Sequence, residues 1–229
     1  MDDRIDQNAV RLGVYSVTEA AHYVNAHPQT VRSWFRPSRE SSREPLFLSD
    51  YAQMTDQLVI SFSDLVDVHV AARLREGGVS MQHVRKVYEK LAATLGCAHP
   101  FCYKKLYVHN GKVFAGVARD MGDDALVEVL SDQSFIQAVM KPHLKQIDYD
   151  AKSLMARRWR IADGILLDPR IRMGAPLVAG TRIPAITLAR AFEAEDRDAE
   201  YVAQIYGVAP EDVAHAVAFA TRAGGRKAA

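Results

Sequence analysis

A short segment that begins at Pro28 carries side chains of the kinds that read DNA. If the segment is a helix, Val31 and Trp34 face inward and the polar residues between them face outward. Amide and hydroxyl groups can hydrogen-bond to base edges, and arginine binds phosphate or guanine. The predicted DNA-binding residues are therefore Gln29, Thr30, Arg32 and Ser33, together with Arg36 and Arg39, which extend the positive charge past the end of the helix.

A second informative segment spans residues 167–184, where glycines and prolines alternate with arginines. Gly174 and Gly180 can adopt positive φ, and Pro176 and Pro184 fix φ and remove hydrogen-bond donors. We expect a loop of defined shape that presents Arg182 either to a partner or to a carboxylate or carbonyl of its own domain. The residues assigned to partner binding or loop shaping are Gly174, Pro176, Gly180, Thr181 and Arg182.

Metal-binding and catalytic patterns are weak. Cys97, Cys102 and His109 contain zinc-type ligands, but the spacing of the two cysteines is wider than usual and no second ligand pair follows. We expect two reduced thiols and no metal. The sequence has no glycine-rich phosphate loop with its lysine, no His-Glu-x-x-His helix and no nucleophile elbow. The prediction is a binding protein that is not an enzyme and uses no cofactor.

Composition gives bounds on the environment and the partners. The 229 residues contain 29 Lys and Arg against 28 Asp and Glu, so no overall basic field favours indiscriminate nucleic-acid binding. No apolar run approaches the roughly 20 residues of a membrane-spanning helix, and the first residues are too acidic for a signal peptide. We expect a cytoplasmic protein.

Residues 1–96 are predicted to form a winged helix–turn–helix. Ser16 can cap a helix with apolar residues at 17, 20, 21 and 24, and Pro28 can open the reader helix. Residues 46–48 and 58–60 are expected to form the two strands of the wing. Two further helices follow, one capped by Ser63 and ending at Gly77, the other capped by Ser80 and ending at Gly96.

This order of elements resembles the DNA-binding domain of MerR-type regulators. The sequence Leu-Arg-Glu-Gly-Gly-Val-Ser at residues 74–80 matches a phrase that recurs in that family. The resemblance covers residues 12–96 and implies DNA binding. The chain departs from the family after Gly96, where the long dimerising coiled coil does not continue.

Residues 97–163 are predicted to be a β-rich region that serves dimerisation or partner binding. Asn110-Gly111 favours a hairpin between residues 105–109 and 112–117. A strand at 126–130, a short helix at 134–140 and a strand at 153–161 are expected to follow. Arg157, Arg158 and Arg160 could then contact phosphates or an acidic protein, or could equally be the solvated charges of an edge strand.

Residues 164–229 are predicted to form a bundle of three short helices. The first runs from Pro184 to Glu195 and carries Ile186, Ala189 and Phe192, and the second is capped by Asp198 with Val202 and Ile205 inside. The third opens at Pro210 and packs through residues 213, 217 and 219. Because acidic residues crowd these helices, we expect a protein rather than DNA on this face.

Within this last region the chain resembles a family of VapB-type antitoxins, often encoded beside PIN-type ribonuclease toxins. The matching residues are Asp168-Pro169, Gly174-x-Pro176, the run from Gly180 to Pro184, and Tyr-Gly-Val-x-x-Glu-Asp-Val at residues 206–213. The resemblance implies a homodimeric antitoxin that binds operator DNA as an autorepressor and neutralises a PIN-like toxin. The alternative is a MerR-like regulator that responds to a small ligand. The expected fold class is α+β.

Overall fold

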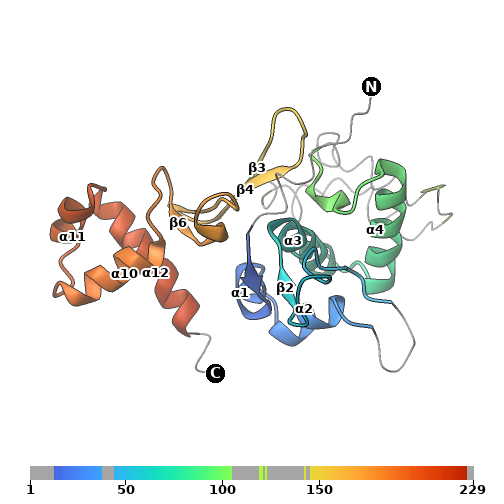
Figure 1. The fold of residues 1–229 in the computed structure, drawn as a ribbon, viewed down its shortest axis with the longest axis horizontal. Coiled ribbons are helices and arrows are strands. Elements are labelled where there is room, and N and C mark those ends of the chain that lie inside the picture. Colours follow the sequence, from blue (N-terminus) through green and yellow to red (C-terminus); the bar gives the residue numbers. More distant parts are fainter. Residues whose placement is uncertain are drawn as a thin grey trace. The chain divides into compact units, whose positions relative to one another are not determined.

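The computed structural model describes residues 13–37, 44–104, 119–120, 122, 142 and 145–225. The chain divides into two compact units, Met1–Arg157 and Arg158–Ala229, which are described separately. Within the described residues, both units combine α-helices with short strands, so the molecule is of mixed helix and sheet composition, as expected for an α+β protein (Figure 1). No helix among these residues is both long enough and apolar enough to cross a membrane.

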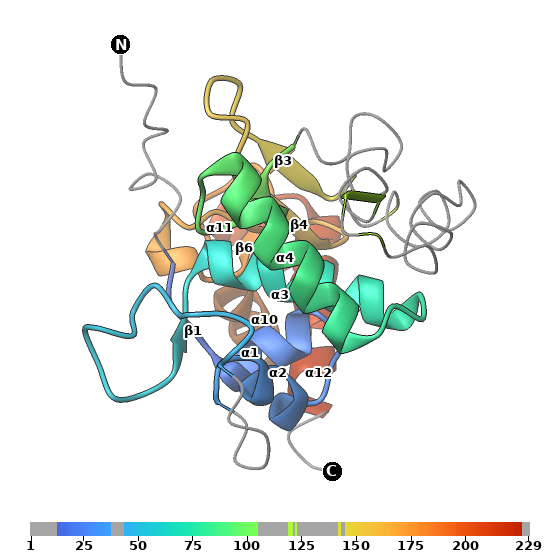
Figure 2. The same cartoon turned by 90° about the vertical axis from the view of Figure 1, so that its right-hand side faces the viewer.

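The first unit begins with two short helices, α1 (Val17–Tyr23) and α2 (Pro28–Trp34), which lie side by side (Figure 2). The Ser16 side chain accepts a hydrogen bond from the Glu19 backbone N–H, and the Glu19 carboxylate accepts one from the Ser16 backbone N–H. This reciprocal capping box fixes the start of α1 where the sequence predicts it. Asn25, with φ of 58°, reverses the chain before Pro28 opens α2.

Two longer helices follow, α3 (Phe62–Glu76) and α4 (Met81–Leu95). The prediction that Ser63 caps α3 is wrong, because Ser61 is the cap and forms a capping box with Asp64. Ser63 lies inside the first turn and is buried. Ser80 caps α4, and Gly96 ends it in the left-handed conformation, both as predicted.

The expected two-stranded wing is also wrong. Val59 and Ile60 form strand β2, which pairs antiparallel with β1 (Tyr15–Ser16) and not with residues 46–48. Phe47 instead packs edge-on against Trp34 and Tyr88, with ring centroids 6.3 and 5.0 Å away. Burial of this ring among other aromatics removes residues 46–48 from the sheet.

The first unit continues with a 3₁₀ turn, η2 (Pro100–Cys102), and strand β3 (Ile147–Tyr149). Three predictions lie outside the described residues, namely the hairpin around Asn110-Gly111, the strand at 126–130 and the helix at 134–140. They stay predictions.

Three antiparallel strands of one sheet open the second unit: β4 (Ala156–Ala162), β5 (Ile165–Leu167) and β6 (Leu177–Val178), with the 3₁₀ turn η4 (Arg172–Gly174) before β6. The strand predicted to start at residue 153 starts at Ala156, because Leu154 has a φ of 59° and lies in a turn. Gly164 makes the β4–β5 turn, where an added Cβ would come within 2.3 Å of His215 Nδ1. Strands β5 and β6 were not predicted.

Three helices complete the second unit: α10 (Ala185–Ala194), α11 (Ala199–Tyr206) and α12 (Pro210–Gly225) (Figure 1). Asp198 caps α11 and Gly207 ends it with positive φ, as predicted. Residues from all three helices and from β5 and β6 share one core: Ile165, Val178, Ala185, Leu188, Val202, Ala203, Val213 and Ala216. The prediction that Ile205 lies in this core is wrong, because it is 54% exposed, and Ile186 on α10 is also 49% exposed.

Candidate functional site

Helix α2 is the helix predicted to contact DNA, and it has one buried apolar side and one exposed polar side. Val31 and Trp34 are 0% and 6% exposed and anchor the helix to the first unit. Gln29, Thr30 and Ser33 are exposed, and Arg32 is half-buried. The structure thus leaves a short polar face of amide, hydroxyl and guanidinium groups on one helix, which is the chemistry that base edges and phosphates require.

The start of this face is fixed by local hydrogen bonds. The His27 side chain caps α2 because its Nδ1 accepts a hydrogen bond from the Gln29 backbone N–H at 3.2 Å. The Ser33 hydroxyl donates to the Thr30 carbonyl at 2.7 Å, so its oxygen can still accept. Arg36 lies just past the end of α2 and is exposed, while Arg39 lies outside the described residues.

Long-range contacts hold the turn between α1 and α2. Arg73, on α3, is 8% exposed and donates from Nη2 to the Val24 carbonyl at 2.6 Å. It also forms an ion pair with Glu76, 2.6 Å away. Arg73 and Val24 are 49 residues apart in the sequence. No short sequence motif links them, so this contact could not be predicted from the sequence.

The second predicted site is the loop between β5 and α10. Gly174 and Gly180 have φ of 83° and 77°, as predicted. The Thr181 hydroxyl donates to the Val178 carbonyl at 2.9 Å and accepts from the Ile183 backbone N–H at 3.0 Å, which closes a tight turn. The Pro176 carbonyl accepts a hydrogen bond from the Ala185 backbone N–H at 2.9 Å, so the loop is tied to the first turn of α10.

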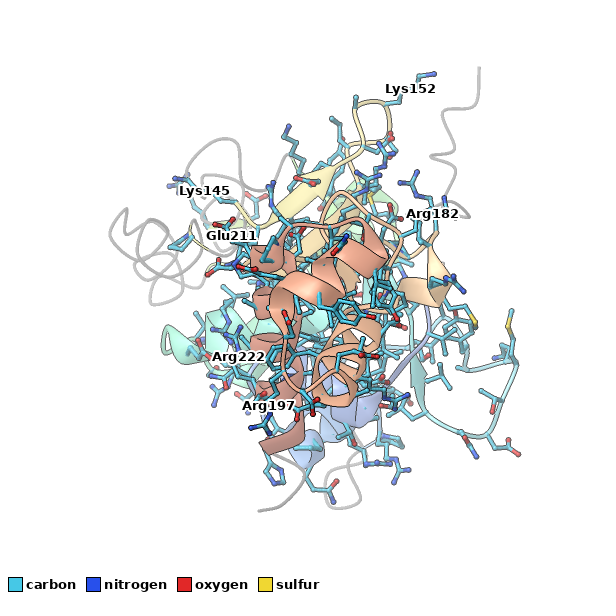
Figure 3. All side chains as sticks on the ribbon, turned by 90° about the vertical axis from the view of Figure 1, so that its left-hand side faces the viewer. Lys145, Lys152, Arg182, Arg197, Glu211 and Arg222 are labelled. Atoms are coloured by element: carbon cyan, nitrogen blue, oxygen red, sulfur yellow. The ribbon has the colours of Figure 1, made fainter. Side chains whose placement is uncertain are left out.

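Arg182 lies in this turn and its side chain extends away from the ribbon (Figure 3). It is exposed and forms no hydrogen bond or ion pair with the described residues. The sequence suggests two roles for Arg182, a contact with a partner or a contact that holds its own loop in place. The described contacts therefore give no support to the second role. The guanidinium is available to a carboxylate or phosphate of another molecule.

Two other arginines, Arg158 and Arg170, form the internal ion pairs of this region, and both bind the carboxylate of Asp168. This carboxylate is 0% exposed and accepts hydrogen bonds from Arg158 Nε at 2.7 Å and from Arg170 Nη2 at 3.0 Å. Burial opposes ionisation of Asp168, but the hydrogen bonds from Arg170 and Arg158 outweigh it and lower the pKa of the carboxyl below its ordinary value. Arg158 is thus committed to an ion pair, while Arg160 is exposed.

Helix α11 and its surroundings expose apolar side chains among acids. Tyr201 and Ile205 are 49% and 54% exposed and lie four residues apart, which places them on one face of the helix. Five exposed carboxylates lie along residues 193–200, and of these Glu193 is paired with Arg197 at 3.0 Å (Figure 3 labels Arg197). The exposed carboxylates of this surface would repel a phosphate backbone.

Comparisons with known proteins match a family model to only part of the chain. A family model described as "Protein of unknown function (DUF433)" matches residues 165–220. The crystal structure of Rv2018 from Mycobacterium tuberculosis is similar in fold, with a TM-score of 0.68 and 19% sequence identity over 89% of this chain and 96% of that chain. No curated protein matches the sequence. The similarity to Rv2018 supports the fold across both units, and the family match is confined to the second.

Proposed function

We propose that this protein is the antitoxin of a type II toxin–antitoxin system. Its first unit binds operator DNA through α2 as an autorepressor, and its second unit neutralises a PIN-like ribonuclease toxin by direct contact. The protein acts by binding and not by catalysis. The observation that best supports the proposal is the separation of chemistries: DNA-reading side chains lie on α2, whereas the unit with the family match exposes apolar residues among acids.

The proposed DNA contact uses the outer face of α2. A helix in the major groove contacts base edges through its first residues and phosphates through flanking arginines. Gln29 and Ser33 supply hydrogen-bonding groups for bases, and Arg36 supplies charge at the end of the helix. Two copies of the chain are needed to read an inverted repeat, and this is why we propose a homodimer.

The proposed toxin contact uses the second unit. Tyr201 and Ile205 would be buried by the toxin, and the carboxylates around them would meet basic groups on it. By analogy with the antitoxin family, Arg182 would reach the acidic, metal-binding active site of the PIN-like enzyme and compete with the metal. The exposure of Arg182 and its lack of a described ionic partner support this role.

Coexpression tests the proposal against the alternative of a ligand-responsive MerR-like regulator. The full chain is coexpressed with the ribonuclease encoded beside it, and a tag on the chain is used for purification. An antitoxin retains the ribonuclease in a defined stoichiometric complex. A regulator of the alternative kind purifies alone and changes its DNA affinity when a small ligand is added.

A matched pair of variants locates the contact. Ile205→Glu introduces a charge on the exposed apolar face of α11 and is expected to weaken toxin binding about 10-fold or more. Gln204→Glu adds the same charge at the neighbouring exposed position, on another side of the helix, and is the control. Equal loss in both variants, or in neither, would contradict the assignment of this face.

A further inference from the structure

The first unit buries a cluster of carboxylates around one imidazole. Asp50 lies in the segment before β2, Asp64 and Asp67 lie on α3, and His99 follows α4. Asp64, Asp67 and His99 are 1%, 1% and 6% exposed, and the Asp50 side chain is 11% exposed at the rim. Sequence analysis did not single out any of these residues, because they are brought together from three separate parts of the chain.

One nitrogen of His99 is oriented by a carboxylate behind it. Nδ1 lies 2.8 Å from Asp67 Oδ2, and the Tyr88 hydroxyl lies 2.8 Å from the same oxygen. Both ring nitrogens lie within hydrogen-bond distance of a carboxylate, and loss of the Nε2 proton to a bound ion would leave the Nε2 lone pair directed away from Asp67. A carboxylate that orients a histidine through its far nitrogen is the usual support of a metal-ligating imidazole.

The other nitrogen faces two more carboxylates. Nε2 lies 3.1 Å from Asp50 Oδ1, and one ligand atom from each of Asp50, Asp64 and His99 lies within 4.8 Å of the others. The 3.1 Å separation fits two donors of one small cation, since Zn–N and Zn–O bonds are each about 2 Å long, and donors up to 4.8 Å apart would have to move closer as the ion binds. Asp50 and Asp64 are themselves fixed, because Asp50 Oδ2 accepts from the Ser61 hydroxyl at 2.8 Å and Asp64 Oδ2 accepts from the Ser61 backbone N–H at 2.9 Å.

The electrostatics of the cluster also favour a cation. Asp50 and Asp64 bring two carboxylates to the same side of one imidazole, and Asp64 is almost fully buried. A divalent ion next to Asp50 and Asp64 would offset the cost of burying their negative charges together.

We propose that Asp50, Asp64 and His99 bind one Zn²⁺ ion, with Asp67 and Tyr88 as the residues that orient His99. Three protein ligands of N and O type, with a water at the partly exposed Asp50 side, match the coordination that zinc adopts. An imidazole ligand disfavours Mg²⁺ and Ca²⁺, which take oxygen ligands. The ion would join the segment before β2 to α3 and to the segment after α4, and so stabilise the unit that carries α2.

This site differs from the one that the cysteines suggest. Cys97 and Cys102 are both buried, and the Cys102 thiol lies 3.4 Å from the Ser63 carbonyl. Neither belongs to the described group of side chains that could hold an ion, and His109 lies outside the described residues. A zinc site made of Asp and His ligands is therefore distinguishable from a thiolate site by spectroscopy.

The test uses the full chain, stripped of metal with a chelator and dialysed. Calorimetric titration with Zn²⁺ is expected to give one ion per chain and a higher melting temperature. Co²⁺ in place of Zn²⁺ is expected to give the visible bands of four-coordinate cobalt without a sulfur-to-metal charge-transfer band. No stoichiometric binding by the folded wild-type chain, six-coordinate Co²⁺ bands or a thiolate band would each overturn the proposal.

Variants separate the ligands from their surroundings. Asp67→Asn, which alters only the orienting carboxylate, is expected to weaken zinc binding by about 10–100-fold. His99→Gln is expected to weaken it at least as much, and Asp56→Asn, an exposed carboxylate in the same segment as Asp50, is the control. If His99→Gln does not fold, Asp50→Asn at the rim replaces it. Unchanged zinc affinity in a folded ligand variant contradicts the assignment.

Discussion

Arg32 is the residue that most directly tests how α2 is used. It is the one arginine within the helix, and it is half-buried beside the exposed Gln29 and Ser33. Arg32→Ala is expected to weaken specific DNA binding by on the order of 1–3 kcal/mol, because a guanidinium that contacts guanine or phosphate is lost. Fluorescence anisotropy with operator DNA measures the change. Arg222→Ala, which removes an exposed arginine from α12 (Figure 3), is the control for loss of net charge.

A substitution of Arg182 tests whether this single side chain contacts the partner. Since it forms no hydrogen bond or ion pair with the described residues, Arg182→Ala is expected to leave the melting temperature unchanged. Inhibition of the ribonuclease is expected to weaken about 10-fold, the loss of one charge-assisted contact. A lower melting temperature with normal inhibition would assign Arg182 to the loop, and no change in either quantity would refute both roles.

At the scale of elements, the Asp168 cluster makes the loop after β5 sensitive to acid. The carboxyl has a lowered pKa in the folded state, so its contribution to stability is present above the unfolded-state pKa of about 3.9 and is lost as the pH falls through the folded value. Asp168→Asn is expected to reduce the free energy of unfolding by on the order of 2 kcal/mol at pH 7. The difference from wild type should shrink below about pH 4.

Calorimetry of the full chain between pH 3 and pH 7 follows this effect. Asp163→Asn, which alters an exposed carboxylate in the neighbouring β4–β5 turn, is the control. A difference between Asp168→Asn and wild type that does not depend on pH would contradict the role of the ionised carboxyl.

The ends of the helices are the features that could be predicted from the sequence. Caps and turns are local, and Ser16, Pro28, Gly96 and Asp198 are each placed as expected. Their residue types satisfy helix ends or adopt positive φ whatever lies elsewhere in the chain.

The predictions from the sequence are wrong where residues far apart in the chain compete for the same strand partner or the same place in the core. The partner of β2 is β1, more than 40 residues earlier, while Phe47 is buried among the rings of Trp34 and Tyr88. Ile205 shows the right spacing for burial, yet Val202 and Ala203 already fill the inner face of α11. The cluster of Asp50, Asp64 and His99 joins residues up to 49 positions apart, so no local spacing could predict it.

At the scale of the whole molecule, the proposed use of α2 requires two copies. A single short reader helix contacts few bases, and a helix–turn–helix dimer gains specificity from two half-sites about one helical turn apart. The free protein is expected to be a symmetric dimer at micromolar concentration and its operator an inverted repeat. Light scattering and footprinting measure these properties. A strictly monomeric species that protects a single half-site would contradict the prediction.

If this chain neutralises a ribonuclease by binding it, the ribonuclease should lose its activity in proportion to the amount of chain added. The product of the neighbouring gene, which we propose to be the ribonuclease, is purified, and cleavage of a labelled RNA is followed as the full-length protein is added. We expect activity to fall to background near one equivalent of protein, and Ile205→Glu to shift the curve to higher concentration. Full ribonuclease activity in the presence of a tenfold excess of folded wild-type protein would contradict it.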